Sequence, residues 1–354
     1  MEENYARIDD GLAFMLKYEN VSRYEDGAVI ILDRRVYPAS VEYVHCEDYR
    51  AVARAIGEMV TQSGGPWLAA SLGMVSAARA CIGLSGEKAR ELLESAAYTL
   101  THARPTTSRR MVAYIQTVVE TAWEALEAGK DPEQAAYQYV MDRLEDRYRK
   151  ARRIGENVVS LLPDDVTILT QCFAETLIGY TLSVAQEQGK TVRLYCPETR
   201  PYLQGARLTA SVAYDQGVPV TVVTDNMPGY LLSQGMVDVF VCAADVISLD
   251  GYVVNKIGTY QIALAAHENK VPFYVMGSPS PVNRTIDTVK IEERDPQEVL
   301  HAMGSRTAKE GVNGFYPAFD ITPPKLVSAV ITAEGIFSPY NLKATYDKGD
   351  IVDE

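Results

Sequence analysis

Hydrophobic and polar residues follow different patterns in the two halves of this chain. Near the N-terminus the apolar positions form short runs, at 29–32 after the Asp26-Gly27 turn signal and again at 41–44, and these runs predict strands. From residue 48 to about residue 150 the apolar spacing becomes helical. The first half therefore predicts short strands followed by helices.

One helix start is well marked inside this helical region. Asp131 is suited to cap a helix, Pro132 is tolerated in the first turn, and Gln134 can close a capping box. The later segment 142–153 (DRLEDRYRKARR) is strongly charged, which is typical of a solvated helix that connects two domains.

After Pro163 short β-rich runs alternate with helical stretches. Spacings of roughly 20 to 35 residues fit βα units and imply a parallel sheet with helices on both faces. A further helix is predicted from Asp295-Pro296. The predicted strands are 166–169, 192–196, 218–223, 237–242 and 271–276.

The fold class is therefore α/β, and 354 residues are more than one hydrophobic core usually serves. We expect an N-terminal domain of short strands followed by helices over residues 1–150 and an α/β domain over 151–354.

Charge narrows the classes of partner. The formal net charge is −13 and the pI is about 4.9, and a negative field of this size repels nucleic acid and anionic membranes. It also disfavours a phosphorylated substrate, so a phosphate site needs local positive charge or a helix N-terminus. The chain contains no GxGxxG or GxxxxGK loop, and its four histidines follow no ligand spacing, so we expect neither a cofactor nor a metal.

The five cysteines are odd in number and widely spaced, with no CxxC motif. They predict free thiols in a reducing compartment. The N-terminal segment is acidic without an apolar signal core, and no run approaches the ~20 apolar residues of a membrane span. These features predict a cytoplasmic protein.

Ligands of an open parallel sheet bind beyond the carboxyl ends of its strands, and this rule selects candidate residues. Cys172 follows the first predicted strand of the second half and Asp245 follows the fourth. A thiol and a carboxyl that converge on one edge suit proton transfer. Arg200, Gln204, Asn255 and Lys256 would anchor hydroxyl or phosphate oxygens.

Each candidate has a plainer interpretation. A lone cysteine after a strand is usually a small buried hydrophobic residue, and Asp245 could simply cap the next helix. Lys256 could be a solvated side chain. Cys196 and Cys242 lie within predicted strands and are expected to be structural.

Several stretches resemble the family of methylthioribose-1-phosphate isomerases and the related regulatory subunits of the initiation-factor exchange complex. The resemblance covers nearly the whole chain and is densest over residues 166–340; at the N-terminal end, Ala103-Arg104-Pro105-Thr106 matches more loosely. The main motifs are TQC at 170–172, ETRPYLQGARLT at 198–209, AD at 244–245, NKIGTY at 255–260 and PAFDITP at 317–323.

The resemblance implies a Rossmann-like C-terminal domain, a smaller N-terminal α+β domain and a homodimer. It places Cys172 and Asp245 on the family's catalytic pair. It also implies that the family's substrate-contacting positions correspond to Ser63, Gly64, Gly65, Arg104, Gln204, Asn255 and Lys256.

This chain departs from the family pattern at three positions. Ser63 stands where the family has an arginine that helps to hold the substrate phosphate, in Ser63-Gly64-Gly65-Pro66. Val246 and Phe173 replace a common arginine and asparagine beside the catalytic pair. Arg104, Arg109 or Arg110 could restore the lost charge, and Gly64-Gly65 could offer backbone N–H groups to an anion.

The resemblance implies an aldose–ketose isomerase that converts 5-methylthioribose 1-phosphate, or a similar sugar such as 5-deoxyribose 1-phosphate, to the ribulose form. We expect Asp245, protonated because it follows an apolar run, to act as acid at the ring oxygen. Cys172, as a thiolate near a helix N-terminus, would move the proton between C2 and C1. A hydride shift would use the same residues.

Two alternatives stay open at this point. A ribose-1,5-bisphosphate isomerase would need more positive charge, whereas a 5-thio or 5-deoxy sugar needs an apolar pocket, which Trp67, Leu68 and Phe173 could supply if they are not core. A non-catalytic regulatory subunit that senses sugar phosphates or nucleotides would not need Cys172 and Asp245 together.

Overall fold

The structure is a computed structural model that describes residues 7–104, 108–302 and 304–346, without the side chains of 108–110. The chain forms two compact units. Of the described residues, 7–10 and 14–149 belong to the N-terminal unit, and 11–13 and 150–346 belong to the C-terminal unit. Among the described residues, no helix is long and apolar enough to cross a membrane.

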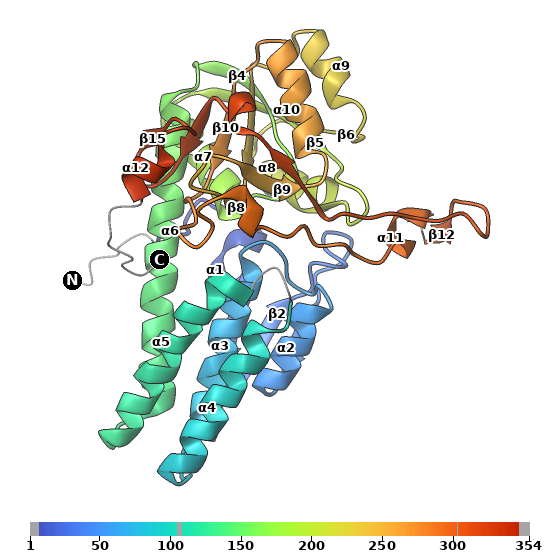
Figure 1. Cartoon of the computed structure of the whole chain (residues 1–354). Helices are drawn as coiled ribbons and strands as arrows, with labels where there is room; N and C mark the ends of the chain where they lie inside the picture. The colour runs from blue at the N-terminus through green and yellow to red at the C-terminus, as the bar shows by residue number, and fades with distance from the viewer. Residues whose placement is uncertain (1–6, 105–107, 303, 347–354) are drawn as a thin grey trace. The chain divides into compact units, whose positions relative to one another are not determined.

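The N-terminal unit combines a small antiparallel sheet with a group of helices (Figure 1). Its sheet has the order β1-β2-β3, and the two strand predictions in this region are confirmed to within two residues. The elements are α1 (Tyr18–Val21), β1 (Ser22–Glu25), β2 (Ala28–Leu32), β3 (Tyr43–Cys46), α2 (Tyr49–Gly57), α3 (Gly65–Ala80), α4 (Gly86–Thr101), α5 (Ser108–Glu127) and the first part of α6 (Pro132–Ser160), whose residues from Lys150 onward belong to the C-terminal unit.

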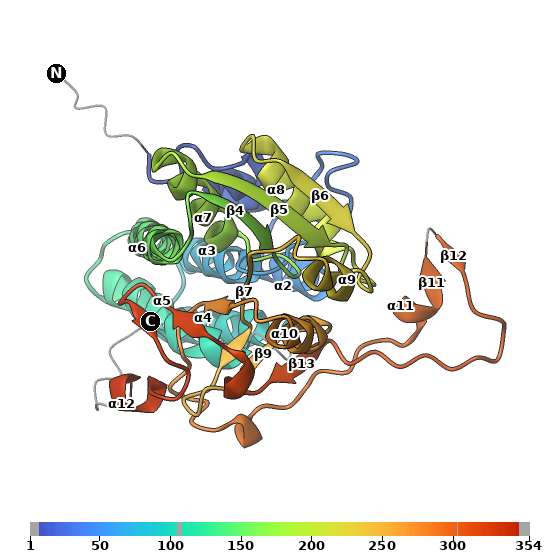
Figure 2. The ribbon, with the colours of Figure 1, turned by 90° about the horizontal axis from the view of Figure 1, so that it is seen from above.

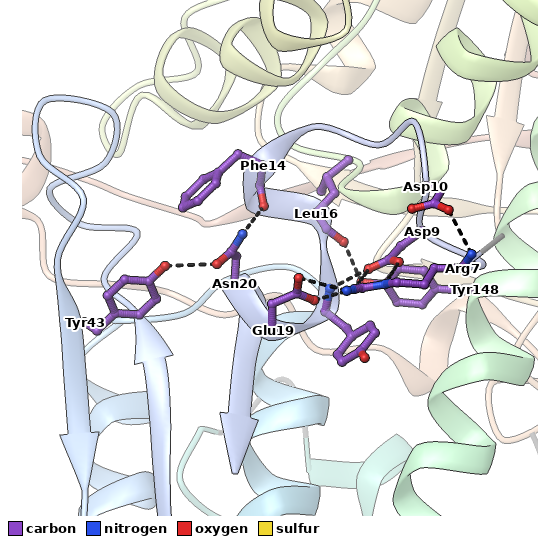
Figure 3. Close-up of polar contacts among 10 residues, drawn as sticks. Arg7, Asp9, Asp10, Phe14, Leu16, Glu19, Asn20, Tyr43 and Tyr148 are labelled. Atoms are coloured by element: carbon purple, nitrogen blue, oxygen red, sulfur yellow. Dashed lines mark hydrogen bonds and ion pairs between the residues drawn. The ribbon is translucent and has the colours of Figure 1, made fainter. Parts of the chain in front are cut away.

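A charged cluster holds the first described residues of this unit in place (Figure 3). The Arg7 guanidinium donates to the Asp9 carboxylate at 2.8 Å and to the Glu19 carboxylate at 2.5 Å. The phenol of Tyr148, on α6, donates to the backbone carbonyl of Leu16 at 2.7 Å. Side-chain hydrogen bonds therefore tie the N-terminal segment to α6.

Helix α6 begins as predicted but ends later than its charge pattern suggests. Asp131 accepts hydrogen bonds from the backbone N–H groups of Glu133 and Gln134, at 2.9 and 3.2 Å. The helix continues to Ser160 because a buried apolar stripe that includes Ile154 and Val158 runs past the charged segment.

The C-terminal unit is built on a seven-stranded sheet of order β15-β14-β10-β7-β4-β5-β6. All neighbouring strands are parallel except β14 and β15. The five predicted strands are all present, and the α/β fold class is confirmed. The strands are β4 (Asp165–Leu169), β5 (Thr191–Pro197), β6 (Val220–Val223), β7 (Val239–Ala243), β10 (Phe273–Met276), β14 (Ala329–Ile331) and β15 (Ile336–Phe337).

Helices cover both faces of this sheet (Figure 2). Helices α7 (Thr176–Glu187) and α8 (Ala210–Asp215) lie on one face, and α9 (Pro228–Ser233) and α10 (Thr259–Glu268) lie on the other. This arrangement follows from right-handed crossovers that proceed in opposite directions from the centre of the sheet.

A second sheet in this unit was not predicted. Strands β8 (Val246–Ile247), β9 (Val253–Lys256) and β13 (Phe319–Thr322) form an antiparallel sheet of order β13-β9-β8. Strands this short have too little alternation to stand out in a sequence, and β13 pairs with β9 from far along the chain.

An extended arm leaves the C-terminal unit between β10 and β13 (Figures 1 and 2). It carries α11 (Gln297–Leu300) and the strand pair β11 (His301–Ala302) and β12 (Ser305–Arg306). The predicted helix after Asp295-Pro296 is present but has only four residues. At the root of the arm, Glu293 forms an antiparallel bridge with Pro317.

Candidate active site

The predicted catalytic cysteine and aspartate follow neighbouring strands where the strand order of the sheet reverses. β4 lies between β7 and β5, so the chain proceeds from β4 in one direction and from β7 in the other. Cys172 comes shortly after β4 ends at Leu169, and Asp245 shortly after β7 ends at Ala243. Ligands of open α/β sheets bind at this kind of switch point.

The loop after β4 contains residues with a positive φ angle, a backbone conformation that residues other than glycine rarely adopt. Cys172 has φ +61° and Glu175 has φ +51°. Thr199 and Leu203, in the loop after β5, have φ +64° and +58°. Each such residue costs about 1–3 kcal/mol, and clusters of them occur at functional sites.

Hydrogen bonds from the next strand connection hold Cys172 in this conformation. Its backbone N–H donates to the Thr199 hydroxyl at 3.2 Å, and its carbonyl accepts from the Thr209 hydroxyl. Asp225, after β6, in turn accepts from the backbone N–H groups of Thr199 and Arg200, both at 2.7 Å. The ETRPYLQGARLT motif therefore fixes the position of the cysteine.

Burial raises the pKa of the Cys172 thiol to about 11. The charge of Lys256 opposes this shift, the charge of Asp245 adds to it, and Arg294 also lowers the pKa of the thiol. The expected thiolate at a helix N-terminus is therefore not the resting form: the thiol is protonated at neutral pH because loss of solvation outweighs the nearby cations.

The predicted environment of Asp245 also needs correction. Its side chain is exposed, although the strand before it is buried. The apolar run ends with β7, and Asp245 turns into the second sheet, where its backbone N–H donates to Val254 at 2.9 Å. The carboxyl is therefore solvent-exposed, and the poor solvation that the sequence suggested is not present.

Asn255 and Lys256 lie at the end of β9 and are buried. The Asn255 amide donates to the Thr259 hydroxyl at 3.1 Å and approaches the Cys242 sulfur at 3.5 Å. The Lys256 ammonium lies 4.8 Å from the centre of the Phe319 ring. Burial lowers the pKa of Lys256, and the charge of Cys172 partly opposes this shift. Lys256 is therefore an enclosed cation and not a solvated side chain.

The glycine of the NKIGTY motif positions the start of α10. Gly258 has φ +104°, and a side chain there would approach the Gln171 amide at 3.0 Å. Asp320 accepts from the backbone N–H groups of Gly258 and Tyr260, at 2.7 and 3.1 Å. Burial raises the pKa of Asp320 to about 6. This aspartate of the PAFDIT motif therefore occupies the helix N-terminus.

Three polar atoms near the carboxyl ends of β4 and β5 are buried without a hydrogen-bond partner among the described residues. They are the Thr170 hydroxyl oxygen and the amide oxygens of Gln171 and Gln204. Buried acceptors without partners are costly, and a polar ligand can supply the missing donors. Gln204 was a predicted binding residue, and Thr170 and Gln171 come directly before Cys172 in the TQC motif.

The other predicted binding residues belong to the N-terminal unit. Ser63 has φ +59°, and Gly64 and Gly65 form the start of α3. A side chain at Gly65 would lie 1.9 Å from the Thr61 hydroxyl, so only glycine fits. Arg104 lies just after α4 and is half-buried. The side chains of Arg109 and Arg110 lie outside the described residues.

A buried arginine beside this loop was not predicted from the sequence. Arg34 is fully buried and donates to the Gln62 carbonyl at 2.6 Å. Its Nη1 lies 3.2 Å from where a Gly65 Cβ would stand. A positive charge therefore lies next to the loop of Ser63, where the family resemblance led us to expect an arginine. The sequence around Arg34 gives no sign that this side chain is buried beside that loop.

Trp67, Leu68 and Phe173 were suggested to line an apolar pocket, and they differ in how buried they are. Leu68 and Phe173 are buried, as core residues are. Trp67 is half-buried, lies 4.8 Å from Tyr114 between ring centres, and has Arg147 5.2 Å from its ring.

Comparison with known proteins adds three findings. Residues 65–339 match the model of the Initiation factor 2 subunit family. A methylthioribose-1-phosphate isomerase from Desulforamulus reducens is 38% identical, over 90% of this chain and 96% of its own length. A second, from Thermotoga petrophila, is 39% identical over 87% of this chain and 92% of its own length.

Two solved structures are also similar to this chain over most of its length. The 5-methylthioribose 1-phosphate isomerase of Pyrococcus horikoshii superposes with a TM-score of 0.82 at 28% identity, over 98% of this chain and 99% of that one. The delta subunit of translation initiation factor eIF-2B from A. fulgidus superposes with a TM-score of 0.78 at 30% identity, over 91% of this chain and 96% of that one.

Proposed function

The chain belongs to the Initiation factor 2 subunit family, among the methylthioribose-1-phosphate isomerases, and is an aldose–ketose isomerase; we propose that its substrate is 5-methylthioribose 1-phosphate. The observation that carries this proposal is the strained loop that presents Cys172 beside Asp245 at the switch point of the sheet. A subunit that only senses ligands has no need of a thiol held at this cost.

An aldose 1-phosphate opens its ring only with help, because its anomeric oxygen carries the phosphate. In the proposed mechanism, protonated Asp245 gives its proton to the ring oxygen as the C1–O bond breaks. The Cys172 thiolate takes the C2 proton, which leaves an enediol, and then returns that proton to C1. The C2 hydroxyl gives its proton to Asp245, and both residues are regenerated.

Before the first of these reaction steps, one proton must move from the Cys172 thiol to the Asp245 carboxylate. The high pKa of the Cys172 thiol, about 11, makes that transfer unfavourable in the free protein. Lys256 and Arg294 lower the thiol pKa and so reduce the cost of the transfer. Gln204 and Asn255 are proposed to bind sugar hydroxyl groups.

The phosphate is proposed to be held by Ser63, Gly64, Gly65 and Arg104. The backbone N–H groups at the start of α3, a helix of 16 residues, favour an anion. Arg34 adds the positive charge that Ser63 does not provide. A single phosphate site of this kind supports a sugar monophosphate as the substrate. We propose that the reaction belongs to methionine salvage.

We further propose that the protein is a cytoplasmic homodimer. All five cysteines are free thiols. Helices α9 and α10 pack against each other and expose the large apolar residues Tyr230, Tyr260 and Leu264, next to Met227 just before α9. These exposed residues support an interface between copies. Sedimentation velocity would distinguish a dimer from a monomer.

The test is turnover of the purified protein with 5-methylthioribose 1-phosphate, 5-deoxyribose 1-phosphate and ribose 1,5-bisphosphate, measured as ketose formed. We expect the highest kcat/KM on the methylthio sugar. Preference for another of these sugars would contradict the substrate and retain the chemistry. No turnover on any sugar, together with binding of sugar phosphates, would indicate a regulatory subunit instead.

A further inference from the structure

Arg294, at the root of the arm, is enclosed by aromatic rings. Its guanidinium carbon lies 5.6 Å from the centre of the Tyr202 ring and 5.7 Å from that of Phe319. Its Nε donates to the Glu292 carboxylate at 2.7 Å, and its backbone N–H donates to Tyr316 at 2.9 Å. Only 9% of the side chain is exposed. The guanidinium is therefore held in one place.

One donor of this guanidinium has no acceptor in good geometry. The Nη1 atom of Arg294 and the phenol oxygen of Tyr316 are both buried, and neither has a hydrogen-bond partner of normal geometry among the described residues. The two groups are close enough to interact, because Arg294 opposes the rise that burial causes in the pKa of the Tyr316 phenol. A buried charged donor without an acceptor is costly, and the cost is recovered when an anionic oxygen binds. A purely structural arginine would be expected to use its donors on the protein, as Arg306 on the same arm does with three protein acceptors.

The charge of Arg294 also acts on the catalytic thiol. The Lys256 ammonium and the Arg294 guanidinium lie 4.8 and 5.7 Å from the centre of the Phe319 ring, so one ring borders both cations. The charge of Arg294 lowers the pKa of Lys256 and of Cys172. Two enclosed cations that repel each other form a site suited to negative charge near the reacting carbons.

We propose that Arg294 is a catalytic residue that, together with Lys256, donates to the C2 oxygen of the sugar as negative charge develops there. This inference rests on the proposed function. In the second half of the reaction the thiol of Cys172 gives its proton to C1, and the carbon–carbon π electrons form the new C1–H bond. The C2 hydroxyl loses its proton to Asp245, and the O–H electron pair becomes the C2=O bond. The C2 oxygen carries the transient charge.

The test compares Arg294→Met, Arg294→Lys and the control Arg306→Met in steady-state kinetics on the sugar that the wild type prefers, with inorganic phosphate as a competing anion. Loss of one such donor typically lowers kcat by about 100-fold or more. We expect that loss for Arg294→Met, with KM and phosphate inhibition changed by less than about threefold. Arg294→Lys should retain part of the activity, and Arg306→Met should match the wild type.

Different results separate this inference from the proposed function. An active wild type with an equally active Arg294→Met variant would overturn the inference alone. A loss confined to KM, with phosphate inhibition weakened in parallel, would also overturn it, because Arg294 would then bind the phosphate. If Arg294→Met does not fold, the kcat of Arg294→Lys decides: an unchanged kcat contradicts the role, and a lowered kcat at normal KM supports it. A wild type inactive on every sugar would overturn both proposals.

Discussion

Arg7 and Arg294 illustrate two uses of an arginine in this molecule. Arg7, in the N-terminal unit, is 44% exposed and binds two carboxylates, one of them on a fully buried side chain, Asp9. Arg294, in the C-terminal unit, is 9% exposed, binds one carboxylate and keeps a buried donor without a partner among the described residues. A saturated cluster stabilises a fold, whereas an unsaturated one is suited to a ligand.

The same contrast separates the residues around each arginine. The cluster around Arg7 consists of complete ion pairs and hydrogen bonds that anchor a chain segment (Figure 3). The charge of Arg294 acts on a strained cysteine, Cys172, and on an enclosed lysine, Lys256. Changes in the first cluster should therefore alter stability, and changes in the second should alter activity.

The largest effect is expected from the catalytic pair. Cys172→Ser and Asp245→Asn should each lower kcat by at least about a thousandfold, because each removes a proton carrier. Thermal unfolding should change little, since Cys172 is half-buried and Asp245 is exposed. Steady-state kinetics and calorimetry measure the two quantities on the same samples.

Cys196→Ser is the matched control for this prediction. Cys196 is a fully buried thiol within β5, so a hydroxyl there should lower the melting temperature without a specific effect on kcat. Near-normal turnover in Cys172→Ser or in Asp245→Asn would remove that residue from the catalytic pair.

The next effect concerns the protonation of Cys172. Only the thiolate reacts with iodoacetamide, and a thiol with a pKa of about 11 loses its proton well above the ordinary value of a free cysteine. The alkylation rate of Cys172 should therefore rise about tenfold per pH unit from pH 8 to 10 without levelling off. Mass spectrometry of the labelled peptide measures the rate at this residue.

A rate that levels off near pH 8.5 would show that burial does not control this thiol. Arg294→Met should make the alkylation slower at a given pH, since loss of a nearby positive charge raises the thiol pKa further.

The smallest effect belongs to the N-terminal cluster. Arg7→Met should lower the free energy of unfolding by about 1–3 kcal/mol, because it leaves the buried Asp9 carboxylate without its cation. The value of kcat should not change. Urea unfolding and kinetics on the same sample measure both.

Arg149→Met is the comparison, because Arg149 and its partner Glu145 are both more than half exposed. Breaking that pair should cost less than about 0.5 kcal/mol. Equal losses for the two variants would mean that the Arg7 cluster is an ordinary surface ion pair.

The amino-acid sequence is most informative where local rules apply. Apolar runs locate the five main parallel strands, and the rule for carboxyl ends selects Cys172 and Asp245 from the order of those strands. Features that depend on distant residues do not show in such local patterns. Arg294 is enclosed by rings from two other motifs, and Arg34 reaches a loop nearly thirty residues away.

The predicted burial of Asp245 and the predicted thiolate form of Cys172 were wrong for the same reason. An apolar run before Asp245 suggested burial, but burial depends on where the chain turns after β7 ends at Ala243. A helix after Cys172 suggested a thiolate, but loss of solvation outweighs the nearby positive charges. Such balances arise only when the elements have packed together.

The hydrogen bonds that hold the backbone of Cys172 also have a consequence for how the protein folds. It joins a loop after β4 to hydroxyl groups after β5, and an aspartate after β6 in turn fixes that second loop. The left-handed backbone conformation of Cys172 is thus unfavourable until three consecutive strands, β4, β5 and β6, have paired. During refolding, catalytic activity should therefore return only after β4, β5 and β6 have paired. Turnover can then be used to follow the completion of this strand pairing.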